Sequence, residues 1–130
     1  MARYRAIQWT YAALNSVEPA VNNFVLLDTF YAGEEWARLR RPGAEEFARN
    51  KLRRVSDWLG GKQWLEGDRF TIGDLMMTSV FRALRRTDLL EQFDNLAAFK
   101  RRAEARPAFQ RALADQLATY RENQPEGVGA

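Results

Sequence analysis

The residue types that favour helices dominate this chain, and the β-branched types that favour strands are scarce in it. Ala, Leu, Arg and Glu occur throughout its 130 residues, whereas Val and Ile are sparse. The first group has high helix propensity, and β-branched side chains lose rotamer freedom in a helix. No segment recurs at a fixed period, which excludes a repeat array. The sequence therefore predicts a single all-α domain.

The first segment, residues 3–32, carries two stripes at a spacing of seven residues. These stripes are Ile7, Leu14 and Val21 and, on an adjacent face, Tyr4, Tyr11 and Glu18. A seven-residue spacing returns to the same side of a helix after two turns. Pro19 lies within this pattern, has no backbone N–H and crowds the preceding turn. We therefore expect a kink or break near Ser16–Pro19.

Two further helices are predicted in the middle of the chain. The first starts near Pro42, because proline is favoured in the first turn, and the Gly pair at 60–61 ends it. Its apolar face is Ala48, Leu52, Val55 and Leu59. After a loop over 62–69, which carries an apolar Trp-Leu pair, the second starts at Thr71. Its apolar residues cover most of its circumference, which predicts a buried central helix. They are Ile72, Leu75, Met76, Met77, Val80, Phe81 and Leu84.

Two helices are predicted near the end of the chain. Asn95 has the chemistry of an N-cap for a short helix, whose inward face carries Leu96 and Phe99. Pro107 fits the first turn of the last helix. That helix bears Phe109, Leu113, Leu117 and Tyr120. The result is a helical bundle of five or six helices over 1–120, followed by a polar tail over 121–130 that frays or crosses the surface.

The chain contains neither Cys nor His. A disulfide, the common zinc patterns, a Ser-His-Asp triad and a Cys-His pair are therefore excluded. Any general acid or base would have to be Asp, Glu, Tyr, Lys or Arg. We predict no metal site.

The net charge is +3, from 20 basic and 17 acidic residues, and the basic clusters are spread along the chain with acidic residues near each. We interpret these clusters as solvated faces, with an anionic partner as the alternative. No apolar run approaches the roughly 20 residues that cross a membrane. The N-terminus also lacks the apolar stretch of a signal peptide. These features predict a cytoplasmic protein with neither a nucleic-acid nor a membrane partner.

The sharpest local motif is Thr71 followed three residues later by Asp74. This is the spacing of a capping box, in which the Thr71 hydroxyl accepts from the N–H of Asp74 and the carboxylate accepts from the N–H of Thr71. The carboxylate also lies at the positive end of the helix dipole. At the start of a buried helix water cannot satisfy these donors. We interpret both residues as structural.

The passage around this motif, WLEGDRFTIGDL over 64–75, closely resembles the buried capping motif of the cytosolic glutathione transferases, with Gly73 where the family usually has Ala. Two other passages resemble the same family in the same order. The opening RYRAIQW is similar to the first helix of the C-terminal domain in bacterial members, and NLAAF followed by ARPAF is similar to the end of that domain. The resemblance extends from residue 3 to about residue 120.

The resemblance implies that this chain corresponds to the all-helical C-terminal domain. In the family, a thioredoxin-like N-terminal domain binds glutathione, the co-substrate, and holds the catalytic group, and the helical domain supplies most of the pocket for a hydrophobic electrophile. No βαβ pattern precedes residue 3, so no catalytic residue is assigned and no cofactor is expected in this chain. A homodimer is implied as well.

The substrate-pocket candidates follow from the first helix of bacterial relatives, which presents pocket residues seven apart. They are Tyr4, Arg5, Tyr11, Asn15, Glu18 and Arg82. This chain has Tyr11 where several relatives have an Asn that reaches glutathione, and Glu18-Pro19 where they have His-Lys. Half-buried packing is the alternative for Tyr4 and Tyr11, and a helix boundary is the alternative for Glu18.

Two functions from different classes remain open. The first is the electrophile-pocket and dimerisation domain of a glutathione transferase-like protein. The second is a stand-alone helical interaction module of the same fold without catalytic activity. The opening passage favours the first.

Overall fold

The computed structural model describes residues 1–123, which fold into helices connected by turns and loops. The helices are α1 (Ala2–Ala12), α2 (Glu18–Thr29), α3 (Glu35–Leu59), α4 (Ile72–Arg82), α5 (Asp94–Glu104) and α6 (Pro107–Glu122). A π-helical turn, Ala13–Val17, joins α1 to α2, and a 3-10 turn, Leu90–Gln92, precedes α5. The predicted all-α bundle of five or six helices is confirmed.

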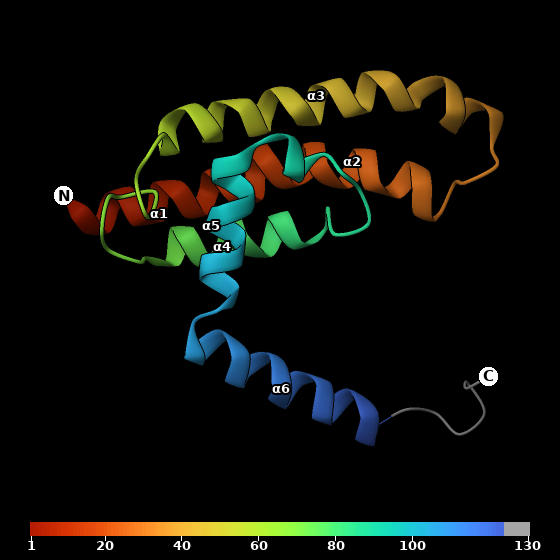
Figure 1. The fold of residues 1–130 in the computed structure, drawn as a ribbon. Coiled ribbons are helices and arrows are strands. Elements are labelled where there is room, and N and C mark those ends of the chain that lie inside the picture. The colour runs from red at the N-terminus through yellow and green to blue at the C-terminus, as the bar shows by residue number, and fades with distance from the viewer. Residues whose placement is uncertain (124–130) are drawn as a thin grey trace.

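The helices are arranged around one long rod made of α1 and α2 (Figure 1). Helix α3 runs beside α2, and α4 lies against α1 on the other side of the rod. Helix α5 crosses the bundle and packs on α4 and α3, and α6 then extends away from the other helices. No helix in residues 1–123 is long and apolar enough to span a bilayer.

The core lies where α2, α3, α4 and α5 meet. Its largest fully buried side chains include Phe24, Phe81 and Phe99. The ring of Phe99 meets the ring of Phe81 edge to face at 6.0 Å between centroids, and that of Trp64 at 5.6 Å. Such pairs stabilise by about 0.5–1.5 kcal/mol beyond the burial of their area. The predicted inward face of α5, with Leu96 and Phe99, is confirmed, since both are fully buried.

The irregularity predicted near Pro19 takes the form of a π-helical turn rather than a break. The Glu18 N–H donates to the Ala13 carbonyl, five residues earlier, and α2 continues directly from that turn. Pro19 lies in the first turn of α2, where its missing N–H is tolerated. The wider turn therefore lets the helix pass the proline without ending.

The prediction that a helix starts near Pro42 is wrong, because α3 begins at Glu35 and contains Pro42 in its interior. Apolar contacts hold the helix on both sides of the proline: Ala37 and Ala44, seven residues apart, are both buried. Arg41 adds two contacts to the Asp28 carboxylate on α2. Tertiary packing thus outweighs the local cost of a proline, about 3 kcal/mol in a helix interior. The predicted end of this helix is correct, since Gly60 follows Leu59 with a φ of +52°.

The N-cap role predicted for Asn95 is also wrong. Helix α5 starts at Asp94, with Phe93 at the N-cap position, so both lie two residues earlier than predicted. The Asn95 amide instead donates to the carbonyls of Ser56 and Gly60 and accepts from the Ser56 hydroxyl, at 2.7–3.1 Å. Its side chain therefore ties the start of α5 to the end of α3.

The last helix begins at Pro107, as predicted, and continues to Glu122, two residues past the expected limit of the helical domain. Residues 124–130, most of the predicted polar tail, lie outside the described residues. Helix α6 contains no fully buried residue.

Candidate functional site

The N-terminus of α4 is organised around the buried carboxylate of Asp74. Its Oδ2 accepts from the Thr71 N–H at 2.7 Å, and its Oδ1 accepts from the Leu65 N–H at 2.8 Å. The Thr71 hydroxyl oxygen accepts from the N–H of Gly73 at 3.2 Å, and the capping box expected between Thr71 and Asp74 is present. The Thr71 hydroxyl also lies 3.1 Å from Oδ2 of Asp74. One carboxylate therefore joins the cap of α4 to the preceding loop.

Gly73 permits a close approach between α4 and α1. A Cβ atom built at this position would lie 2.5 Å from the Cβ of Trp9 and 3.3 Å from the Ala6 carbonyl oxygen. Neither neighbour is the flexible end of a side chain, so α1 would have to move to make room for it. This contact explains why the chain has glycine at a position next to the cap.

The central helix is buried on one side only, so the prediction that it is apolar and covered all round is partly wrong. Met77, Val80 and Phe81 are buried, but Ile72 is 53% exposed and Leu75 is 39% exposed. Beside them, Tyr4, Ile7 and Tyr11 are exposed on α1, which packs along α4. We call these five residues the α1–α4 apolar face.

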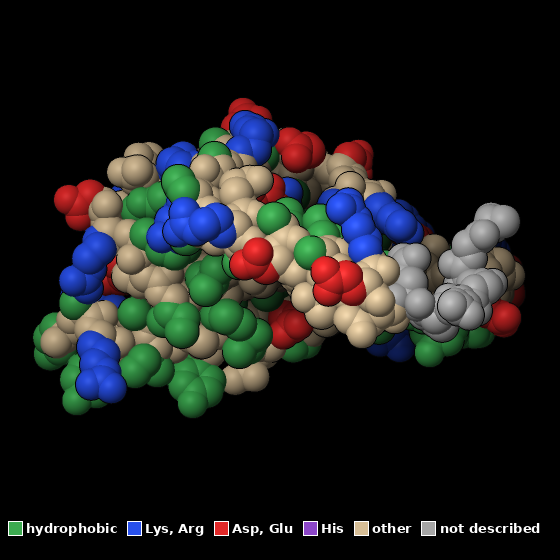
Figure 2. All heavy atoms as spheres, turned by 90° about the horizontal axis from the view of Figure 1, so that it is seen from below, with side chains coloured by type: hydrophobic (Ala, Val, Ile, Leu, Met, Phe, Trp, Pro, Cys, Tyr) green, Lys and Arg blue, Asp and Glu red, His purple; other side chains and the backbone are tan. Residues whose placement is uncertain are grey.

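Figure 2 shows the side of the molecule on which α4 and α6 lie. Hydrophobic side chains gather over its left half, where α1 and α4 begin in Figure 1. Exposed apolar area gathered on one side of a domain is typical of interaction surfaces and ligand-binding grooves.

Two of the six sequence-predicted pocket residues line a groove. Arg5 lies in a groove of about 350 Å³ with Trp9, Trp58 and Glu66. There Glu66 accepts a hydrogen bond from the Trp9 indole at 3.0 Å and pairs with Arg5 at 3.7 Å. Because Glu66 already has both partners, this groove presents mainly the two indole rings, whose centroids are 5.5 Å apart.

Arg82 lies in a second groove, of about 260 Å³, between α4 and α6. Its guanidinium pairs with Glu104 at 3.3 Å and lies 5.2 Å from the centre of the Phe109 ring. Arg106 packs over the Phe70 ring in the same region, at 3.5 Å. Arginine therefore connects α6 to the bundle mainly through the faces of aromatic rings.

The other four candidates, Tyr4, Tyr11, Asn15 and Glu18, line none of the grooves described in residues 1–123. Tyr4 and Tyr11 are 73% and 62% exposed, so half-buried packing does not describe them in this structure. Asn15 is exposed in the π-helical turn, and Glu18 is partly buried at the start of α2.

The largest of the five grooves described in residues 1–123, of about 590 Å³, contains none of the six sequence-predicted pocket residues. It lies between the C-terminal end of α2 and the end of α4 with the loop that follows. Val25, on its wall, is seven residues beyond Glu18 and so continues the stripe from Tyr4. If the seven-residue spacing is extended by two more helical turns, from Glu18 to Val25, the sequence indicates this wall of the groove. We call it the α2–α4 groove.

Asp28, on the lining of this groove, is paired with Arg41 of α3. The Arg41 guanidinium contacts both carboxylate oxygens of Asp28 at 2.8 and 2.9 Å and pairs with Glu45 at 2.8 Å. The hydrogen bonding that Arg41 donates to the Asp28 carboxylate is the main cause that raises the pKa of Arg41 above its usual value. Asp28 is thus the partner of a cation on α3 rather than a free acid in the groove.

Comparison with known proteins defines the class of the chain. The family model described as "Glutathione S-transferase, C-terminal domain" matches residues 24–116. The chain therefore belongs to the glutathione S-transferase C-terminal domain family, and the resemblance found in the sequence is confirmed.

The similar proteins are glutathione transferases. Glutathione S-transferase GstA of Escherichia coli O157:H7 is 30% identical over 114 residues, which are 87% of this chain and 53% of that protein. A glutathione transferase of Burkholderia graminis, solved with two glutathione molecules per subunit, is 25% identical with a TM-score of 0.77 over 85% of this chain and 49% of that one. A family member from Pseudomonas fluorescens pf-5, solved with two glutathione bound, shares the fold at 24% identity and a TM-score of 0.78, over 87% of this chain and 52% of that one. The chain spans about half the length of these relatives.

Proposed function

We propose that this chain is the electrophile-pocket and dimerisation domain of a glutathione transferase-like protein, in which glutathione is joined through its thiol to a hydrophobic electrophile. The chain itself supplies no catalytic residue in this proposal. A thioredoxin-like domain binds glutathione and activates the thiol. The two relatives solved with glutathione support glutathione as the co-substrate.

The observation that carries the proposal is the α1–α4 apolar face. Ile72 and Leu75 belong to the central helix, yet they are about half exposed, and Tyr4 and Tyr11 lie on the helix beside them. A further domain packed on this face would bury these side chains at about 25 cal/mol per Å² of apolar area. Tyr4 and Tyr11 belong both to this face and to the stripe of candidate pocket residues, so the further domain would border the pocket.

In this arrangement the stripe residues and the end of α4 form one wall of the electrophile site. Tyr4, Tyr11 and Glu18 present their side chains at a spacing of seven residues, and Arg5, Asn15 and Arg82 supply the polar groups around them. Thr71 and Asp74 hold α4 in position and do not touch substrate. No metal takes part.

The proposal includes a homodimer and a cytoplasmic location. A second apolar region supports the dimer, because large side chains are exposed where α2 ends and α3 begins: Leu26, Phe30, Tyr31, Trp36 and Leu39. Isologous contact between two copies of such a region is the commonest way in which a homodimer forms.

The test compares this chain alone with a fusion that places the N-terminal half of the Escherichia coli O157:H7 relative before it. The chain alone should give no turnover of glutathione with 1-chloro-2,4-dinitrobenzene above the buffer rate, and isothermal titration should detect at most weak glutathione binding. The fusion should conjugate glutathione to the same chloride, because the added half supplies the thiol-activating group.

Turnover by the chain alone, or low-micromolar glutathione binding to it, would contradict the proposal. So would a fusion that folds by circular dichroism and binds glutathione but gives no turnover. A chain that stays monomeric at millimolar concentration favours the stand-alone interaction module instead.

A further inference from the structure

The groove that contains the two indole rings, of about 350 Å³, lies between α1, the end of α3 and the loop before α4. We call it the Trp9–Trp58 groove. Its lining residues are Arg5, Gln8, Trp9, Ala12, Trp58 and Glu66. Apart from Arg5, none of them belongs to the proposed wall of the electrophile site. The chemistry of this groove is therefore independent of the proposed function.

Two hydrogen bonds fix the indole rings of the Trp9–Trp58 groove. The Trp9 N–H donates to Glu66 at 3.0 Å, and the Trp58 N–H donates to the Leu65 carbonyl at 2.8 Å. The ring planes are inclined at 49° to one another, and Trp58 is 50% exposed. Because both ring donors are already engaged, the rings offer a ligand their π faces rather than hydrogen bonds.

The face of the Trp58 ring already attracts an ammonium group of the chain itself. The Lys62 Nζ lies 4.4 Å from the ring centroid, although Lys62 does not line the groove. The π face of an aromatic ring carries negative charge density, and indole attracts cations more strongly than the rings of Tyr or Phe. The two indoles therefore favour a positively charged ligand over a neutral one of the same shape.

Glu66 adds a formal negative charge to the groove. Its side chain is only 12% exposed. One carboxylate oxygen accepts from Trp9, and the other lies 3.7 Å from the Arg5 guanidinium, which is beyond hydrogen-bond distance. Since each carboxylate oxygen has two lone pairs, the group keeps acceptor capacity on the groove side.

Arg5 is the lining residue that opposes a cation in this groove. Its side chain is 66% exposed, and its pair with Glu66 is long. Exposed ion pairs contribute little, so the guanidinium can turn toward solvent when another cation approaches the carboxylate. Arg5 is thus a weak competitor for Glu66.

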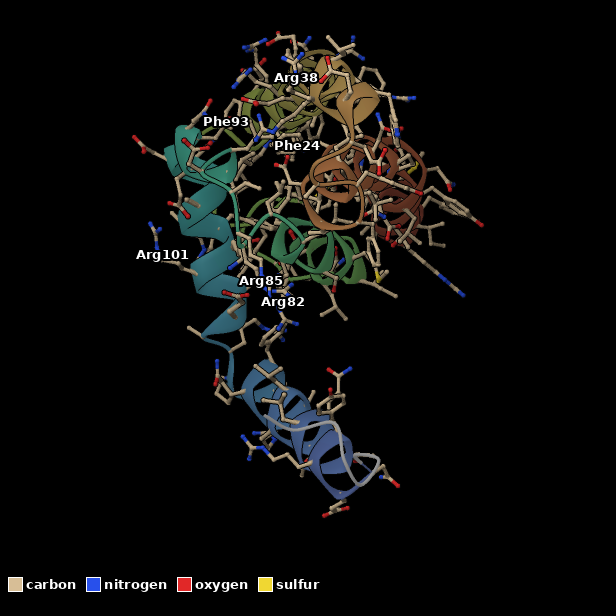
Figure 3. The ribbon with its side chains drawn as sticks, turned by 90° about the vertical axis from the view of Figure 1, so that its right-hand side faces the viewer. Phe24, Arg38, Arg82, Arg85, Phe93 and Arg101 are labelled. Carbon is tan, nitrogen blue, oxygen red and sulfur yellow. The ribbon has the colours of Figure 1, made fainter. Side chains whose placement is uncertain are left out.

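The groove lies at the end of the bundle where α1 begins and α3 ends, on the left in Figure 1. Figure 3 looks from the opposite end, where Arg38 lies near the start of α3. The apolar region that supports the proposed dimer is also at that opposite end, where α2 ends and α3 begins. The proposed dimer therefore leaves the groove open.

We propose that the Trp9–Trp58 groove binds a small organic cation with a quaternary ammonium head group. The methyl groups of the head pack on the two indole rings, and its positive charge lies near the Glu66 carboxylate. A quaternary ammonium has no N–H groups, so it needs no acceptors beyond that carboxylate. A primary ammonium such as that of lysine is more strongly hydrated and would lose more on entering the groove.

The experiment compares choline with 3,3-dimethyl-1-butanol, which has the same shape but a carbon atom in place of the charged nitrogen. Titrations followed by NMR at the indole N–H signals give both the dissociation constant and the location. Choline should shift the signals of Trp9 and Trp58 and leave those of Trp36 and Trp64 in place. The neutral alcohol should bind about five- to tenfold more weakly, because it loses the attraction of the rings and of the carboxylate.

Two variants on the lining should change choline binding in opposite directions. Glu66→Gln keeps an acceptor for the Trp9 N–H but removes the charge, and should weaken choline binding about two- to fivefold. Arg5→Gln removes the competitor and should strengthen it by a similar factor. Arg3→Gln is the control, because Arg3 is exposed on the same helix and lines no groove described in residues 1–123.

Trp58→Leu should weaken choline binding about two- to fivefold, the range of a partly exposed cation–π contact. Trp36→Leu is its matched control, since Trp36 is similarly exposed, at 47%, and lies outside the groove. Vesicles of phosphatidylcholine identify the source of the head group. Sedimentation of the chain with the vesicles, lost in Trp58→Leu, assigns a lipid head group, and choline binding without sedimentation assigns a free cation.

The inference is overturned by absence of choline binding, by equal affinity for choline and the neutral alcohol, or by shifts centred away from Trp9 and Trp58. Changes of the same sign in Glu66→Gln and Arg5→Gln also contradict it, since damage to the fold would weaken binding in both. The opposite signs keep the test decisive even where Trp58→Leu fails to fold.

Discussion

Helices α5 and α6 follow one another in the chain and both are amphipathic, yet they are covered to different extents. Helix α5 has 11 residues and buries Leu96, Ala97, Phe99 and Ala103. Helix α6 has 16 residues and buries none. An apolar face therefore indicates that a helix needs a partner, but not whether the same domain supplies it. The inner helices are stabilised within this chain, whereas α6 has no buried residue and the α1–α4 apolar face is exposed in the described residues.

The largest effect in the inner region is expected from Asp74→Ala. The change removes the acceptor of the Leu65 and Thr71 N–H groups and leaves an apolar site around them. Each unsatisfied buried donor costs roughly 1–3 kcal/mol, so the free energy of unfolding should fall by about 3–5 kcal/mol. The free energy of unfolding is measured by urea denaturation, monitored by circular dichroism.

Asp68→Ala is the matched control, because Asp68 is exposed in the same loop and forms no described hydrogen bond or ion pair. It should change the free energy of unfolding by less than about 0.5 kcal/mol. An equal loss in both variants would show that loop charge, rather than the capping contacts, stabilises this region.

A pair of glycine substitutions tests the contact between α1 and α4. Gly73→Ala places a Cβ 2.5 Å from that of Trp9, so the helices must separate, at a cost of about 1–3 kcal/mol. Gly43→Ala, inside α3, meets nothing within 4 Å and should stabilise by up to about 1 kcal/mol. The two midpoints in urea should thus move in opposite directions. A Gly73→Ala variant that is more stable than the parent would mean that α1 can move away from α4 at little cost, and so is not part of the tightly packed inner region.

Asn95→Ala tests the tie between α5 and α3. The amide makes hydrogen bonds with Ser56 and Gly60, and its loss should lower the free energy of unfolding by about 1–2 kcal/mol. Asn22→Ala, on the exposed side of α2, is the comparison and should be close to neutral. If Asn95→Ala leaves the free energy of unfolding unchanged, the hydrogen bonds between Asn95 and the end of α3 do not stabilise the fold.

Helix ends with strong local chemistry were predictable from the sequence. Gly60 ends α3, Thr71 starts α4 and Pro107 starts α6, because glycine, a capping hydroxyl and proline each favour one backbone geometry. The predictions that Pro42 starts a helix and that Asn95 caps one were wrong, because at these positions tertiary contacts outweigh the local preference. Their surroundings, Arg41 with Asp28 in one case and the end of α3 in the other, come from residues distant in the chain.

The candidate site was predicted mainly as a stripe of residues along α1 and the start of α2. The stripe of Tyr4, Tyr11 and Glu18 follows from a spacing of seven, and these residues remain proposals. The α2–α4 groove forms where the ends of two helices meet, so Arg85 could be placed there only by the tertiary structure. A stripe of residues on one helix can predict the wall of a site that this helix forms. The opposite wall comes from another helix, and its position depends on how the two helices pack.

The smallest effect is expected on α6, from Leu117→Ser. Leu117 is 43% exposed and contacts no described pocket, so the free energy of unfolding should change by less than about 0.5 kcal/mol. The same change removes apolar area from a face that the bundle leaves open, so weak, concentration-dependent self-association should decrease, as measured by sedimentation velocity. A loss above about 1 kcal/mol would mean that α6 folds back on the bundle in solution. In that case the difference in burial between α5 and α6 would not describe the protein in solution.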